Sequence, residues 1–276
     1  MKKLFLFIAA IAAISMSSQA QQVKSGEIEV GDYTNASQVY NGSYFAMAPT
    51  NFYLAHTGAQ LLYTPDLLAD LNGKQNVKIT SLGFKFYCES FEDISRNMKV
   101  YLQETDAVEF AMNEDGIKQF FAFDNLALED SYNIDMVDSY GVDVEVNVPL
   151  TMSTPFALTP GKSLLVTILF DADDNDNCTM GSDYAPFYTS GIGAHAMTYT
   201  NNTTSFLDYA QGTDFPNATA TLGCGTNVEL PVTRIQYTYT EGGGETSYKR
   251  GDTNLDGDVT VADVSALIDY LLTGQW

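Results

Sequence analysis

The sequence has 276 residues with 13 Lys and Arg against 35 Asp and Glu, so its formal net charge at pH 7 is −22. A surface this acidic repels the phosphates of nucleic acids and the head groups of anionic lipids, so neither is expected as a partner. Hydrophobic residues make up 45% of the chain, which is long enough to bury one large core beside a smaller unit.

The start of the chain, residues 1–20, predicts a signal peptide. Two lysines precede an unbroken apolar stretch at 4–14, which is shorter than an ordinary membrane-spanning helix. Ser18 and Ala20 are small residues at the two positions that a signal peptidase recognises, so cleavage is expected before Gln21. We therefore expect an exported bacterial protein in the periplasm, at the cell surface or in the medium, without a transmembrane segment after cleavage.

Residues 21–240 have the pattern of an all-β domain. Strand-like runs, in which apolar and polar residues alternate for much of the length, are separated by turn clusters. These runs are 77–87, 98–103, 142–148 and 234–239. Residues 163–170 are apolar almost throughout and predict a buried central strand. Many strands with little helix between them favour an antiparallel β-sandwich over a parallel sheet.

Several segments of this domain match a recurring module. They are 59–63, 79–84, 98–102, Pro155–Phe156 and 161–166. In order and spacing they resemble a jelly-roll sandwich module of exported proteins of gut and oral bacteria, often found beside adhesin-like and dockerin-like units. The resemblance implies a single jelly-roll-like β-sandwich over most of residues 30–240. Because the matching positions are mainly core and turn residues, it concerns fold more than function.

The domain contains three cysteines, Cys88, Cys178 and Cys224. They are far apart and match no zinc-binding spacing. Export permits one disulfide with one thiol left over, and the sequence does not choose the pair. Three buried free thiols are an equal alternative, since cysteine is often a small core residue.

The sequence assigns no catalytic residue. The two histidines, His56 and His195, are each isolated in the sequence and are expected to be loop or core residues. No Gly-x-Ser-x-Gly, HExxH or phosphate-loop pattern occurs. Among 35 acidic residues some pairs will lie at glycosidase distance in any fold, so the sequence selects no pair. Loops rich in Asp, Asn, Gly and Tyr suit sugar hydroxyls.

A flexible linker is predicted over 241–250, because Gly, Glu, Thr and Ser dominate its first part. The final unit, 251–276, begins with the spacing of a calcium-binding loop. Oxygen-bearing side chains occupy loop positions 1, 3 and 5, and Gly257 occupies position 6, where the chain must turn sharply. The predicted calcium ligands are Asp252, Asn254, Asp256, Asp258 through its carbonyl, Thr260 directly or through water, and Asp263. Calcium suits such a set because it binds about six to eight oxygens.

A helix is predicted from Asp263 to about Leu272, directly after the loop, as in the second half of an EF-hand. Its apolar residues recur at helical spacing and form one stripe. The residues of this stripe that are expected to face a partner are Val264, Leu267, Ile268 and Leu271. Gly274 predicts the end of the helix.

The loop and helix together resemble one repeat of a type I dockerin. The matching residues, about a tenth of the chain, are Gly251–Asp252, Asn254, Asp256–Gly257, Val259, Asp263–Val264, Leu267, Ile268 and Tyr270–Leu272. In that family two repeats pack together, bind two calcium ions and dock onto cohesin modules, which assemble polysaccharide-degrading enzymes. This sequence contains one repeat, so the resemblance implies calcium binding more directly than docking to a cohesin-like or other protein partner.

The predicted fold is all-β: an antiparallel, jelly-roll-like β-sandwich followed by a short calcium loop–helix unit, half of an EF-hand or dockerin. The leading functional interpretation is an exported, non-catalytic binding or adhesion protein, with glycans among its expected ligands. The first alternative is a polysaccharide-degrading glycoside hydrolase, or an accessory subunit of such a system, which the dockerin-like unit suggests. The second alternative is a structural spacer that presents a docking unit.

Overall fold

The computed structural model describes residues 22–36, 48–50, 55–87, 94–114, 116, 118–134, 145–171, 187–201, 222–241, 251 and 260–274. The chain divides into a β unit, Val23–Tyr239, and a second unit that contains the C-terminal helix. The predicted signal peptide, Cys88 and Cys178 lie outside the described residues. Within those residues, no helix is long and apolar enough to cross a membrane.

In the described residues, ten strands and one short 3-10 helix precede the C-terminal helix. The strands are β1 Val23–Val30, β2 His56–Tyr63, β3 Lys74–Tyr87, β4 Ile94–Thr105, β5 Leu126–Ile134, β6 Glu145–Ala157, β7 Ser163–Asp171, β8 Ala196–Asn201, β9 Leu222–Val228 and β10 Thr233–Glu241. The 3-10 helix is η1, Ala69–Leu71, and the C-terminal helix is α3, Val261–Thr273.

The strand predictions are confirmed at the level of a mostly β, antiparallel fold. The runs 77–87, 98–103 and 234–239 lie within β3, β4 and β10. The run 142–148 overlaps β6, which begins at Glu145. Alternation located these strands because each has one face in the core and the other facing outward.

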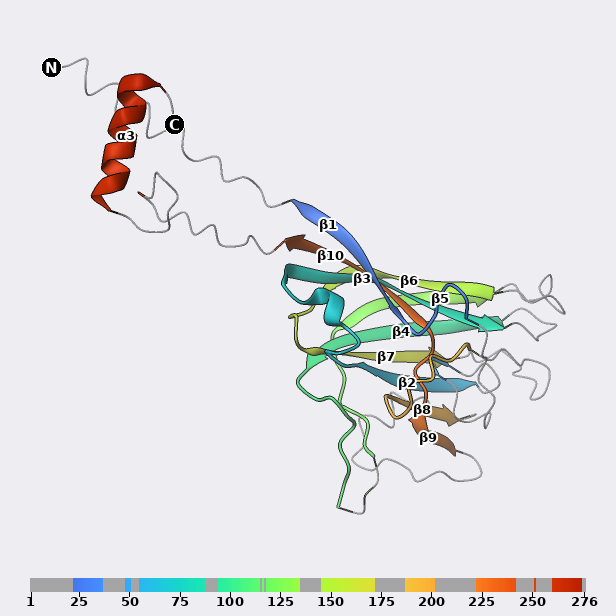
Figure 1. Cartoon of the computed structure of the whole chain (residues 1–276). Helices are drawn as coiled ribbons and strands as arrows, with labels where there is room; N and C mark the ends of the chain where they lie inside the picture. Colours follow the sequence, from blue (N-terminus) through green and yellow to red (C-terminus); the bar gives the residue numbers. More distant parts are fainter. Residues whose placement is uncertain are drawn as a thin grey trace. The chain divides into compact units, whose positions relative to one another are not determined.

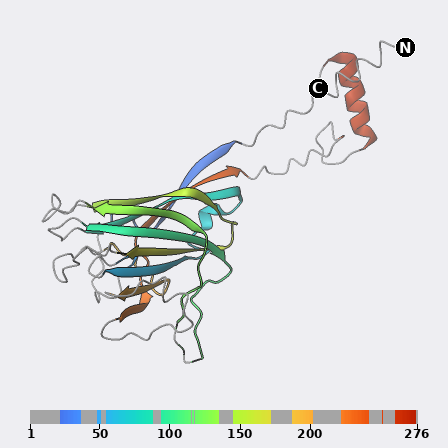
Figure 2. The same ribbon diagram turned by 180° about the vertical axis from the view of Figure 1, so that it is seen from behind.

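The strands form two antiparallel sheets, which appear as two layers in Figure 1 and from behind in Figure 2. Sheet 1 has the order β1-β10-β3-β6, and sheet 2 has the order β5-β4-β7-β2-β8-β9. Consecutive strands frequently lie in different sheets, so the chain crosses repeatedly between the layers. Residues far apart in the sequence therefore become neighbours on one sheet face.

The main core lies between the two sheets. Ile28, Ile79 and Phe84 of sheet 1 belong to the same buried cluster as Leu61 and Val166 of sheet 2. Side chains alternate across a strand, so the intervening residues lie on the outer face of each sheet. Polar residues at these intervening positions determine what each outer face can bind.

A second buried layer covers part of the outer face of sheet 2. Phe110 and Phe120, from the segment between β4 and β5, cluster with Leu165 and Leu169 of β7. Strand β7 is consequently buried on both faces over Ser163–Phe170. This two-sided burial explains why its sequence is apolar rather than alternating, and it confirms the prediction of a buried central strand.

The buried side chain of Gln60 attaches this covering segment to sheet 2. Its amide nitrogen donates to the carbonyl of Phe121 at 2.8 Å and to the hydroxyl of Thr167 at 3.0 Å. Its amide oxygen accepts from the N–H of Phe121 at 2.7 Å. Because Gln60 is fully buried, its polar atoms need partners inside the protein, and these bonds supply them.

Candidate functional site

The start of α3 contains Thr260 and Asp263, both predicted as calcium ligands. The N–H of Thr260 donates to Oδ2 of Asp263 at 2.7 Å, and Asp263 is 1% exposed. The pair has the spacing of a capping box, in which an acidic residue binds the N–H three positions before it. The predicted ligands outside the described residues are Asp252, Asn254, Asp256 and Asp258. The described part of the chain contains no group of three or more His, Cys, Asp or Glu residues that could hold a metal ion.

The apolar stripe that the sequence predicts on α3 is exposed to solvent. The exposed fraction lies between 41% and 66% for Val264, Leu267, Ile268 and Leu271. Aliphatic residues at this spacing cover one face of a helix. An exposed face of this kind has the chemistry of a surface that packs against another one.

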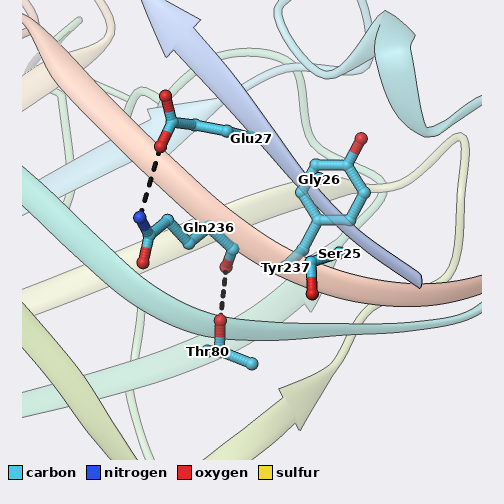
Figure 3. Close-up of a pocket in the computed structure, with 6 residues that line it drawn as sticks. All are labelled: Ser25, Gly26, Glu27, Thr80, Gln236 and Tyr237. Carbon is cyan, nitrogen blue, oxygen red and sulfur yellow. Dashed lines mark hydrogen bonds between the residues drawn. The ribbon is translucent and has the colours of Figure 1, made fainter. Parts of the chain in front are cut away.

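A polar groove with a volume of about 460 Å³ lies on the outer face of sheet 1. Figure 3 shows its lining residues, which come from β1, β10 and β3. They are Ser25, Gly26, Glu27, Thr80, Gln236 and Tyr237. We call this set the sheet 1 groove. Ser25, Glu27 and Gln236 lie on the outer face, because Ile28 and Ile235 of the same strands point into the core. Gly26 and Tyr237 have the inward parity of these two strands.

Hydrogen bonds join the three strands of the sheet 1 groove. The amide nitrogen of Gln236 donates to Oε2 of Glu27 at 3.2 Å, and the hydroxyl of Thr80 donates to the carbonyl of Gln236 at 3.1 Å (Figure 3). The groove therefore contains the carboxylate of Glu27, the amide of Gln236 and the hydroxyl of Thr80 in positions that are fixed before a ligand arrives.

Arg234 orders the acidic side of the groove. Its Nε lies 2.9 Å from Oε1 of Glu27, and its second guanidinium nitrogen donates to Oε1 of Glu29 at 2.8 Å. The guanidinium also lies over the ring of Tyr33, 4.3 Å from the ring centroid. The hydrogen bond to Glu29 raises the pKa of Arg234, so the guanidinium stays charged. One cation thus fixes both carboxylates.

Close packing beneath the groove depends on the glycine at position 26. A Cβ atom on Gly26 would lie 2.4 Å from the ring of Tyr237. Tyr237 is 3% exposed and belongs to the main core. The absence of a side chain at Gly26 lets β1 lie directly over this ring and sets the depth of the groove.

The structure also pairs His56, which is isolated in the sequence, with Asp171. Nδ1 of His56 lies 2.9 Å from Oδ1 of Asp171. The pair forms because β2 and β7 are neighbours and the two residues are directly opposite each other. The other histidine, His195, precedes β8 and is half-buried.

Sequence reasoning missed both the groove and this pair. Glu27 and Gln236 are 209 positions apart, and His56 and Asp171 are 115 apart. The alternation of polar residues indicated which positions face outward, but the pairing of strands decides which of them meet.

No protein-family model matches this sequence, and none of the curated proteins matches it either. A functional proposal must therefore be argued from the structure and the sequence themselves. The features available are the sheet 1 groove, the start of α3 and the polar pairs on sheet 2.

Proposed function

We propose that the protein is an exported, non-catalytic binding protein whose β unit holds a glycan in the sheet 1 groove and whose C-terminal unit binds calcium. The observation that carries the proposal is the fixed set of hydrogen-bonding groups in the groove. Gln236 and Glu27 bind each other, and Thr80 is tied to the backbone of β10. A site ordered in advance loses less side-chain entropy when a ligand binds.

Sugar hydroxyls both donate and accept hydrogen bonds, and the groove matches both roles. The carboxylate of Glu27 accepts, whereas the amide of Gln236 and the hydroxyls of Ser25 and Thr80 can do either. The formal net charge of −22 disfavours acidic polysaccharides. A neutral glycan therefore fits the groove better than a charged one.

The strand order supports a jelly-roll classification of the β unit. Without β8 and β9, the described strands form one sheet of order β1-β10-β3-β6 and one of order β5-β4-β7-β2. Two four-stranded sheets with the first and last strands paired are typical of a jelly roll. In this interpretation β8 and β9 are an added pair at the edge formed by β2.

The calcium part of the proposal rests on the spacing of the loop that starts at Asp252 and on its dockerin-like pattern. The buried carboxyl of Asp263 at the start of α3 fits a closing ligand that also caps the helix. Extracellular sites of this kind commonly have a Kd of ~0.1–1 mM. The exposed stripe of α3 would then serve a cohesin-like or other protein partner.

A glycan array followed by calorimetry tests the groove. The Gln236→Ala variant removes the central amide and is expected to weaken glycan binding at the groove about tenfold or more, as the loss of one or two hydrogen bonds predicts. Gln75→Ala is the matched control, because Gln75 is an exposed glutamine of β3 that does not line the groove. Unchanged binding by the Gln236 variant would refute the site, and release of reducing sugars from polysaccharides would refute the non-catalytic assignment.

A further inference from the structure

A smaller polar pocket, with a volume of about 210 Å³, lies just beyond the end of β1. Its lining comes from the turn after β1, from the segment before β8 and from the residue before β10. The lining residues are Asp32, Asn35 and Ala36, the segment Thr189–Gly191, and Val232. We call this set the β1-end pocket. Asp32 and Asn35 are exposed to solvent whereas Val232 is buried, so polar groups are accessible beside an apolar floor.

Hydrogen bonds and one close approach fix the walls of the β1-end pocket. Oδ1 of Asp32 accepts from the N–H of Asn35 at 2.8 Å and from its side-chain amide at 3.5 Å. The hydroxyl of Ser190 donates to the carbonyl of Leu230 at 2.8 Å. The two walls meet at Gly31, where φ is 75° and a Cβ atom would lie 2.8 Å from Cβ of Ser190. The pocket is therefore ordered before a ligand arrives.

A row of contacts along the outer face of sheet 1 joins this pocket to the sheet 1 groove. Arg234 bridges Glu27, which lines the groove, and Glu29, which lies nearer to the pocket. The hydroxyl of Thr34, in the turn after β1, donates to Oε1 of Glu29 at 3.2 Å. The side chains of Glu27, Glu29 and Arg234 are between 32% and 38% exposed. The surface between groove and pocket is therefore polar, held in place and accessible to solvent.

The length of strand β1 sets the distance between the two ends of this surface. Ser25, Glu27 and Glu29 occupy successive outward positions, since side chains alternate along a strand. Each residue of the strand rises ~3.4 Å, so ~17 Å separates Ser25 from Val30, where β1 ends. A ligand that fills both the groove and the pocket must span at least this length. A hexasaccharide is long enough and a disaccharide is not.

We propose that the sheet 1 groove and the β1-end pocket are two parts of one site, for an extended neutral oligosaccharide that runs along β1. The inference rests on the proposed glycan-binding function of the groove and adds that the site selects long sugar chains over short ones. The groove holds one part of the chain, and the β1-end pocket holds a part several rings away.

The chemistry of the β1-end pocket suits sugar hydroxyls. The amide of Asn35 both donates and accepts hydrogen bonds. A carboxylate has about four acceptor positions, so Asp32 can accept from a ligand hydroxyl as well as from Asn35. The carboxylates of Glu27, Glu29 and Asp32 lie along the path and repel an acidic sugar. A neutral chain therefore fits the whole length.

Calorimetry on the full chain with matched short and long sugars tests the continuous site. The pairs are cellobiose and cellohexaose, mannobiose and mannohexaose, and laminaribiose and laminarihexaose. In the series that binds, the hexasaccharide is expected to bind about tenfold or more tightly than the disaccharide, because only the hexasaccharide makes the additional hydrogen bonds in the pocket. Gln236→Ala should weaken the binding of both.

Asn35→Ala should weaken hexasaccharide binding about tenfold and leave disaccharide binding unchanged, since it removes an amide from the distant end alone. Asp32→Asn, which keeps an acceptor for the N–H of Asn35, is a second and milder variant and should weaken the hexasaccharide severalfold. Asn72→Ala is the matched control, because Asn72 is an exposed asparagine that lines neither the groove nor the pocket. It should change neither affinity.

The outcomes separate this inference from the proposed function. Hexasaccharide binding that is lost in Gln236→Ala but unchanged in Asn35→Ala and Asp32→Asn overturns the continuous site and leaves the groove standing, as do equal affinities for the short and long sugars. Equal weakening of both sugars by Asn35→Ala also overturns the continuous site. Binding that depends on Asn35 but not on Gln236 overturns the groove and the continuous site together. Absence of binding to every sugar overturns both.

Discussion

The β unit buries its apolar side chains between two sheets, where Leu61 and Phe84 are fully buried, whereas α3 leaves its apolar stripe exposed, with Leu271 66% exposed. The β unit is therefore stabilised by contacts between residues far apart in the sequence. The helix has 13 residues, and an isolated helix shorter than ~12–15 residues is only marginally stable in water. The difference implies that packing stabilises the first region, while for α3 we propose that the cap and a bound ion or partner supply the missing stability.

The largest expected effect tests the claim that packing between the two sheets stabilises the β unit. Leu61→Ala should lower the free energy of unfolding of the β unit by about 2–5 kcal/mol, because it removes a fully buried side chain from the cluster shared by both sheets. Urea denaturation followed by tyrosine fluorescence measures it, with Val108→Ala, at a 55% exposed position, as the near-neutral control. Equal losses for the two variants would contradict the assigned core.

A smaller effect is expected at the floor of the sheet 1 groove. Gly26→Ala should cost about 1–3 kcal/mol, because the new Cβ would lie 2.4 Å from the ring of Tyr237 and force the ring or β1 to move. Gly193→Ala is the matched control, since a Cβ there meets nothing within 4 Å. Thermal melting of both variants gives the comparison. A neutral Gly26 variant would show that β1 does not lie over that ring.

The two regions also differ in what their sequences reveal. The alternation at 77–87 and 234–239 reflects a local rule, one buried face per strand, so strands could be located without knowing their partners. The pairing of Gln236 with Glu27, or of His56 with Asp171, depends on strand order, which no local pattern encodes. The proposed calcium loop is the reverse case, because its predicted ligands lie within one short segment and their spacing alone predicts a site.

Calcium should stabilise the C-terminal unit and leave the β unit unchanged. At a calcium concentration ten times the Kd, the expected gain is about 1.4 kcal/mol. Far-UV circular dichroism of the helix signal, with and without EDTA, measures it. Asp252→Ala should abolish the gain, while Asp124→Ala, an exposed acid of the β unit, should keep it. A full calcium response in the Asp252 variant would refute the ligand assignment.

The smallest effect separates the two roles given to Asp263. In EDTA, Asp263→Ala should reduce helix stability by only about 0.5–1 kcal/mol, because it removes the acceptor for the N–H of Thr260 and a negative charge from the first turn. In calcium the same variant should lose more, since it also removes the closing ligand. Asp263→Asn keeps an acceptor for the N–H of Thr260. Compared with Asp263→Ala, it should regain most of the helix stability in EDTA but little of the stabilisation by calcium. Asp269→Ala, at an exposed position within α3, is the control. Equal losses in EDTA and calcium would make Asp263 a cap alone and would remove it from the proposed set of calcium ligands.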